Sequence, residues 1–223
     1  MPAKLWWIIH KDLICECRAR RVWPAMLLMG IVVALVFSIQ MDLLPHQKHQ
    51  IAGGLLWLAI FFAGTVAMDR SFAAERDDGC WDGLSLCPLS PTLIFLAKFS
   101  VNVVALAALQ AALIPLFAVL SGVEWAARPW AMLLVAILGN LGIAAVGTLL
   151  SAVSAGIRHG AGLLVLLVLP LATPVVLAAA EATRLVCEGP IDRQYWQWVQ
   201  FLGGFAAVFI AAGMTLFDYV VED

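Results

Sequence analysis

Charged residues are scarce in this sequence of 223 residues, where Asp, Glu, Lys and Arg together make up 13%. Hydrophobic residues make up 63%, and the mean hydropathy is +0.96. An ordinary soluble domain is about half apolar and about a quarter charged, so a water-soluble fold could not bury so much apolar surface. The net charge of −2 provides no basic surface for a nucleic acid. The composition therefore predicts an integral membrane protein.

Several patterns that would support an enzyme are also missing. The sequence has no GxxxxGK[ST] phosphate-binding loop, no HExxH motif and no dense cluster of His, Asp and Glu. These absences argue against ATP binding by this chain and against metal-dependent hydrolysis. Its five cysteines contain no pair of CxxC units, so we expect reduced thiols rather than a zinc site. We therefore expect a non-catalytic chain without a metal.

Long apolar stretches are what the sequence has instead. Six of them run without charge for at least eighteen residues, and a helix needs about 20 residues to cross a bilayer. The first stretch exceeds the roughly 7–15 apolar residues of a signal peptide and lacks a cleavage site, so we expect all six to be retained. We predict one all-α membrane domain, residues 1–223, with spans at about 22–41, 51–68, 99–123, 130–157, 160–180 and 198–217.

The basic residues predict the orientation of these spans. Nine Lys and Arg side chains fall on one side of the membrane and four on the other, which places both termini in the cytoplasm. Residues 1–21 carry a basic stripe opposite an apolar one, so we expect an amphipathic helix in the cytoplasmic interface. The alternative is a positive cluster that only sets topology. The spans hold no ionisable residue at mid-depth to act as an ion relay, and Lys98 is expected at the cytoplasmic end of a span, where its side chain can snorkel.

Neutral polar residues lie within the third and fourth spans. Such side chains usually form hydrogen bonds between helices, and lining a substrate path is the alternative. The residues are Ser100, Asn102, Gln110 and Asn140.

The fourth predicted span contains several glycines, and the fifth contains two prolines. Glycines in the fourth span allow close approach of another backbone. Pro170 and Pro174 each remove a helical hydrogen bond, so we expect a kinked or broken fifth helix there. The glycines are Gly139, Gly142, Gly147 and Gly156.

The cytoplasmic loop at residues 69–92 combines an apolar anchor with surrounding charge. This combination is typical of a docking site, and a merely solvated loop is the alternative. Docking of a soluble partner would supply the energy source that the chain lacks. The candidate coupling residues are Glu75, Arg76, Asp77, Asp78, Gly79, Trp81, Asp82 and Leu84, with a secondary contact at Arg158 and His159.

Several short motifs are spread along nearly the whole chain. They are, in order, Gly53-Gly54-Leu55-Leu56-Trp57, the Pro88-x-x-Pro91 segment up to Ala97-Lys98, the Arg158-His159-Gly160 turn before Pro170 and Pro174, Glu181 to Arg184, and Phe217 to Val220. Together these motifs resemble those of the CcmB family, the haem exporter permeases of cytochrome c maturation. The sequence resembles the non-proteobacterial branch. Many proteobacterial members have His-Trp where this chain has Asn102-Val103, so no role of that histidine carries over.

The resemblance implies a permease subunit of an ABC-type transporter with an ABC-exporter-like fold in the bacterial cytoplasmic membrane. It implies haem delivery or release for c-type cytochromes, with ATP hydrolysed on a separate ATPase subunit. A haem-handling membrane protein and a periplasmic haem chaperone are the other implied partners, and a second copy of the chain is a further candidate. Haem is then a candidate substrate rather than a firmly bound cofactor. A scaffold without a substrate path, and an exporter of another lipid or drug, remain alternatives.

Two further groups of residues have an ordinary explanation. His46 and His49 share a periplasmic loop with polar neighbours and are expected to be solvated rather than to bind haem iron. Tyr195, Trp196 and Trp198 are expected to form an aromatic belt at the membrane interface.

Overall fold

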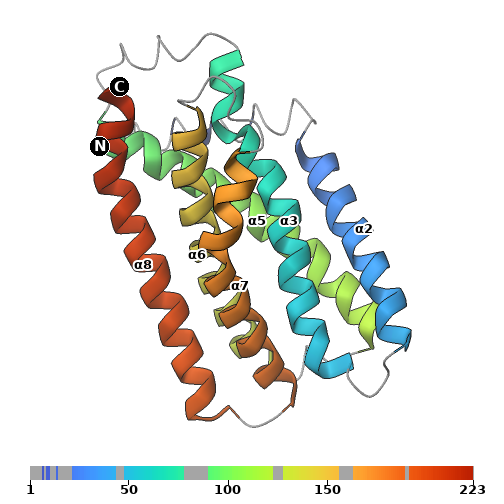
Figure 1. The fold of residues 1–223 in the computed structure, drawn as a ribbon. Coiled ribbons are helices and arrows are strands. Elements are labelled where there is room, and N and C mark those ends of the chain that lie inside the picture. Colours follow the sequence, from blue (N-terminus) through green and yellow to red (C-terminus); the bar gives the residue numbers. More distant parts are fainter. Residues whose placement is uncertain are drawn as a thin grey trace.

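The fold is a bundle of six long helices in a computed structural model (Figure 1). The structure describes residues 7, 9–10, 14, 22–43, 48–77, 90–122, 128–155, 163–188 and 191–222, and no strand occurs among them. Most of the predicted interfacial helix, residues 1–21, lies outside this part of the chain. The helices are α2 (Val22–Leu43), α3 (Lys48–Asp77), α5 (Pro91–Ser121), α6 (Pro129–Ala155), α7 (Leu163–Glu188) and α8 (Arg193–Glu222).

The helices run up and down in alternation, as the all-α membrane prediction requires. Five of them contain a stretch long and apolar enough to cross a bilayer: 50–68 in α3, 91–120 in α5, 129–153 in α6, 167–188 in α7 and 193–217 in α8. In α2 the corresponding apolar stretch, Trp23–Phe37, is shorter. The fold class is thus confirmed, and the crossing of the membrane by α2 stays a prediction.

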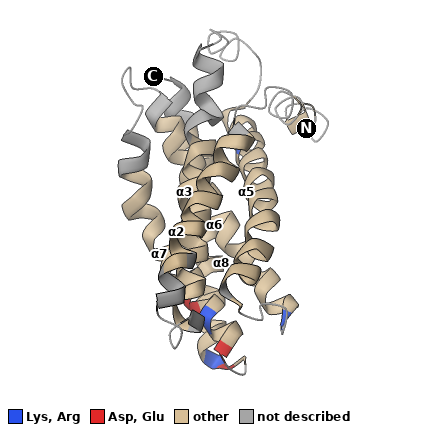
Figure 2. Ribbon diagram, turned by 90° about the vertical axis from the view of Figure 1, so that its right-hand side faces the viewer, with Lys and Arg blue, Asp and Glu red and all other residues tan. Residues whose placement is uncertain are grey.

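The two ends of the bundle differ. At one end, drawn uppermost in Figure 1, α3 and α6 end while α5 begins, and we call this the loop end. At the opposite end α7 ends and α8 begins. In Figure 2 most of the described Lys, Arg, Asp and Glu residues gather at this opposite end, and Lys98 lies in the first third of α5, towards the loop end. The central length is therefore suited to a hydrocarbon environment.

Helix α5 has a defined start and end. Ser90, in an extended conformation with φ −67° and ψ 136°, precedes Pro91, whose fixed φ and missing N–H suit the first helical position. Gly122 ends the helix at φ 66°, with its N–H bonded to the Ala118 carbonyl oxygen at 3.1 Å. Because the helix starts well before residue 99, Lys98 lies within it, about two turns from its start, and is only 6% exposed.

Other helices also extend beyond the predicted spans, and α3 and α7 do so furthest at their C-terminal ends. Helix α3 continues nine residues past Met68, and α7 continues to Glu188 rather than ending near residue 180. At 30 residues, α3 is about 45 Å long, which exceeds the roughly 30 Å hydrocarbon core of a bilayer. Helix α7 is also unbroken at Pro170 and Pro174, so of the two expected alternatives, a break does not occur.

The core is formed around α3 and α6. Helix α3 packs against α2, α5, α6 and α7, and α6 also packs against α7 and α8. The largest fully buried side chains include Trp57, Phe95 and Tyr195. In a membrane the attraction between helices comes from close packing and hydrogen bonds rather than from exclusion of water. The contacts that matter are therefore those in which a large side chain or a polar group of one helix meets a specific position on another.

Candidate functional site

The candidate coupling loop begins at the end of α3. Glu75, Arg76 and Asp77 lie on its last turn, and α5 starts at Pro91, so the loop joins two packed, antiparallel helices at the loop end. The remaining predicted residues lie outside the described part of the chain. They are Asp78, Gly79, Trp81, Asp82, Leu84, Arg158 and His159.

Three of the four neutral polar residues within the spans join α5 to α6. Asn102 Nδ2 donates to Thr148 Oγ1 at 2.9 Å, and Gln110 Nε2 donates to the Ala136 carbonyl oxygen at 3.3 Å. In the reverse direction, Asn140 Nδ2 donates to the Val103 carbonyl oxygen at 3.1 Å. All three donors are at most 5% exposed. This arrangement favours the packing explanation of these side chains over a substrate path.

The fourth polar residue, Ser100, acts differently. Its hydroxyl donates to the Leu96 carbonyl oxygen of its own helix at 2.7 Å. This is the local bond that a serine commonly makes within a helix. Ser100 therefore needs no partner from a neighbouring helix.

A second contact region fastens α3 to α6 and α5 near the loop end. The Ser151 hydroxyl donates to the Met68 carbonyl oxygen at 2.6 Å. The Met68 side chain occupies the space that a Cβ on Gly147 would need. On the α5 side, a Cβ built on Gly64 would lie 2.6 Å from the Leu106 Cδ2 atom. We call the set Gly64, Met68, Asn102, Leu106, Gly147, Thr148 and Ser151 the Met68 joint.

A third region centres on Trp57 of α3, which is fully buried. Its indole Nε1 donates to Thr183 Oγ1 of α7 at 2.9 Å, and Thr183 Oγ1 in turn donates to the Ala179 carbonyl oxygen at 2.7 Å. The indole ring fills the place where a Cβ of Gly139 would stand. Trp57 thus joins α3 to both α6 and α7. Gly139, one of the glycines of the predicted fourth span, thus allows α3 to approach α6 closely.

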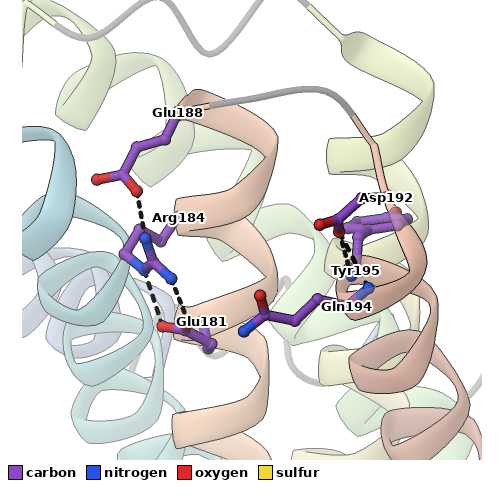
Figure 3. Close-up of polar contacts among 6 residues, drawn as sticks. All are labelled: Glu181, Arg184, Glu188, Asp192, Gln194 and Tyr195. Atoms are coloured by element: carbon purple, nitrogen blue, oxygen red, sulfur yellow. Dashed lines mark hydrogen bonds and ion pairs between the residues drawn. The ribbon is translucent and has the colours of Figure 1, made fainter.

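The opposite end carries an ion-pair network on α7 (Figure 3). Arg184 lies between Glu181 and Glu188 and binds both carboxylates, with Arg184 Nε 2.9 Å from Glu181 Oε2. Glu181 and Arg184 lie one helical turn apart, which places the two side chains on the same face of α7 within reach of each other. Arg128 Nη1 also donates to the Val186 carbonyl oxygen at 3.1 Å, which ties the start of α6 to the end of α7.

The start of α8 is fixed beside this network. Asp192 Oδ1 accepts the backbone N–H groups of Gln194 and Tyr195 at 3.0 and 3.1 Å, as a helix-capping aspartate does (Figure 3). Tyr195 is fully buried, and its hydroxyl donates to the Ala131 carbonyl oxygen at 2.9 Å. The aromatic-belt expectation is therefore wrong for Tyr195. Trp196 is exposed and packs against Trp130, as a belt residue can.

The described residues contain no group of three or more His, Cys, Asp and Glu side chains that could hold a metal ion. Residues 44–47 lie outside the described part, and His46 is among them. The expectation that His46 and His49 are solvated, and do not bind haem iron, therefore stays a prediction.

Sequence reasoning missed three residues of these contact regions. Thr148 and Ser151 occupy the same predicted span as Asn140, and each bonds to another helix or receives a bond from one. Trp57 was identified only as the last residue of the motif that begins at Gly53. The signal that could have found them is a small hydroxyl or a tryptophan within an apolar span, because such a group needs a hydrogen-bond partner in the membrane.

Comparison with known proteins gives consistent matches. The family model described as "CcmB protein" matches residues 3–218. Three relatives are each named "Heme exporter protein B". That of Rhodobacter capsulatus is 32% identical over 63% of this chain and 64% of its own length, and that of Paracoccus denitrificans 35% over 60% and 62%. That of Pseudomonas aeruginosa is 27% identical over 84% of this chain and 85% of its own length.

The alignments with the first two relatives thus cover less than two thirds of those proteins. The family model covers nearly all of this chain, including every helix from α2 to α7 and most of α8. A match of that extent establishes membership, as the motifs had indicated: the chain belongs to the CcmB family.

Proposed function

We propose that this chain is the permease subunit of an ABC-type transporter that acts in haem delivery or release for c-type cytochrome biogenesis. Membership of the CcmB family, together with the relatives' name "Heme exporter protein B", is the observation that carries the proposal. The bundle of long apolar helices agrees with a permease. ATP hydrolysis would take place on a separate ATPase subunit.

The route by which the ATPase would act is the loop at residues 69–92. Helix α3 runs without interruption through its apolar span to Asp77, and α5 begins at Pro91. A protein bound to the loop would therefore hold the ends of two helices that cross the bundle. Trp81 and Leu84 supply apolar contacts for such a partner, and the acidic residues supply charge. Arg158 and His159 fall in the sequence between α6 and α7, and they would touch the partner secondarily.

The remaining partners follow from the same proposal. A haem-handling membrane protein and a periplasmic haem chaperone would receive or release haem at the opposite end, and a second copy of the chain could complete the permease. Haem would be a substrate, with no cofactor held firmly. The scaffold alternative has one supporting observation, because Asn102, Gln110 and Asn140 are all bonded to a neighbouring helix.

The proposed location is the bacterial cytoplasmic membrane, with both ends of the chain in the cytoplasm. An alkaline phosphatase domain fused after Asp223 should then be inactive, since that enzyme folds only outside the cytoplasm, and a green fluorescent protein at the same point should fluoresce. Active phosphatase after Asp223 would show that the orientation is the opposite of the proposed one.

Cysteine labelling is a second test of the orientation. A membrane-impermeant thiol reagent should label Cys187, a half-buried free cysteine at the opposite end, from outside the cell.

The docking role of the loop is tested by Trp81→Ala. Interface hot spots are enriched in tryptophan, and truncating one commonly costs about 2 kcal/mol or more. We expect the ATPase subunit to co-purify poorly with this variant and cytochrome c maturation to fail, while the chain remains inserted. Trp130→Ala is the matched control, because Trp130 is an exposed tryptophan at the opposite end. If the Trp81 variant binds the ATPase as tightly as the control does, the loop is not the docking site.

A further inference from the structure

The end of α3 forms a lever that starts at the Met68 joint. Met68 is the last residue of the apolar span of α3, and the helix continues from there to Asp77. Nine further residues extend about 13 Å at 1.5 Å per residue. A force applied to the loop would therefore reach the span through an unbroken helix, and the joint is where that helix meets α6 and α5.

The joint connects all three helices by specific contacts rather than by apolar packing alone. Ser151 of α6 holds the Met68 carbonyl oxygen of α3, while Thr148 of α6 accepts the Asn102 amide of α5. Met68, Thr148 and Ser151 are at most 1% exposed, and Asn102 is 3% exposed. In two of the contacts, a side chain of one helix packs against a glycine of another: Met68 packs against Gly147, and Leu106 packs against Gly64. Helices joined in this way shift together or exchange one discrete arrangement for another.

We propose that the Met68 joint transmits a displacement of the C-terminal end of α3 to α5 and α6, with Ser151 and Thr148 as positioning residues. The proposal rests on the proposed function, because it assigns the loop to the ATPase. In this arrangement the α5–α6 pair, already joined by its own three hydrogen bonds, moves with α3 as one unit.

The region around Trp57 provides an internal comparison. Thr183 and Thr148 are both fully buried, both accept a side-chain N–H from another helix at 2.9 Å, and both donate to the carbonyl oxygen four residues earlier. Thr183, however, lies in α7 towards the opposite end, away from the loop. Substituting valine removes the same hydroxyl from a site of the same burial in both cases. A difference between the two variants then reports position relative to the loop, not the loss of a hydrogen bond.

The experiment compares Thr148→Val, Ser151→Ala and Thr183→Val in the full chain, expressed with its ATPase subunit in a strain that lacks the natural copy. Three quantities are measured for each variant: the amount of ATPase that co-purifies, the thermal stability of the complex, and the yield of mature c-type cytochrome. We expect all three variants to retain the ATPase and to have similar stability. The yield should fall about fivefold to tenfold in Thr148→Val and Ser151→Ala, within the range typical of lost coupling, and stay near normal in Thr183→Val.

Thr148→Ser separates the hydroxyl from the size of the side chain, because it keeps the acceptor for Asn102 and should restore the yield. Equal yields in the Thr148, Ser151 and Thr183 variants would overturn the proposed role of the Met68 joint. A loss of yield that follows the loss of thermal stability in all three variants would also overturn it. If the unmodified chain does not retain the ATPase, the proposed function itself fails. The two failures are therefore distinguished by the unmodified sample.

Discussion

Replacing Gly139 by alanine is expected to disrupt the bundle, and replacing it by leucine is expected to prevent assembly. The Cβ atom of either residue would occupy the position of the Trp57 indole ring. The ring has little freedom to move, since Trp57 is fully buried and its Nε1 is bonded to Thr183. Overpacking of a core commonly costs about 1–3 kcal/mol, and the rigidity of the ring favours the upper part of that range. Protein level in the membrane and thermal stability in detergent measure the effect.

Gly203 provides the control for this prediction. No atom lies within 4 Å of a Cβ built there, so Gly203→Ala should leave the stability nearly unchanged. The contact itself is tested by combining Gly139→Ala with Trp57→Phe, which removes ring atoms from the overlap. Partial recovery of stability in the double variant is expected, since residues in contact give non-additive effects. Equal tolerance of alanine at positions 139 and 203 would contradict the packing of Trp57 against Gly139.

Reversing the charge of Asp77 and Asp78 together to lysine is expected to abolish cytochrome c maturation. Two acidic residues that precede the proposed anchor Trp81 in the sequence would become basic, so a complementary surface on the ATPase would be repelled. The effect should be largest at low salt, because the screening length shortens from about 30 Å at 0.01 M to about 8 Å at 0.15 M. ATPase retention on the immobilised chain, measured over a series of salt concentrations, tests this dependence.

The neutral variant Asp77→Asn/Asp78→Asn is the matched control for charge reversal. It removes the attraction without adding repulsion, so its ATPase retention should fall between that of the unmodified chain and the lysine variant. A loss that is the same at every salt concentration would show that charge is not what the lysines change. Retention equal to that of the unmodified chain would remove these aspartates from the docking site.

The number and order of the long helices could be predicted from the sequence, because the membrane imposes a simple rule. Each spanning helix needs a long run without charge, and such runs are visible in the sequence. The ends of the helices were harder to predict. Helix α7 continues through Glu181, Arg184 and Glu188, where Arg184 forms an ion pair with each of the two glutamates along the helix. An apolar run stops where charge begins, but a helix whose charges are paired does not.

The partners of the polar residues could not be predicted. The sequence identifies Asn102 and Asn140 as needing hydrogen bonds, but nothing in it says that one would find Thr148 and the other the backbone of α5. Such pairs depend on the rotation of each helix about its axis, which side-chain packing decides. Tyr195 illustrates the same limit. Its aromatic neighbours predict an interfacial position, yet the approach of α6 to α8 buries it against Ala131.

The hydrogen bonds between α5 and α6 also bear on the order in which the chain assembles in the bilayer. Their partners are 46, 26 and 37 residues apart in sequence, and Gly122 ends α5 shortly before α6 begins. The two helices can therefore pair as soon as both have left the insertion machinery. The bond from Trp57 to Thr183, by contrast, spans 126 residues and must wait for α7 to be synthesised. The α5–α6 hairpin thus provides an early preformed surface on which α3 can settle before the late helices α7 and α8 close the bundle.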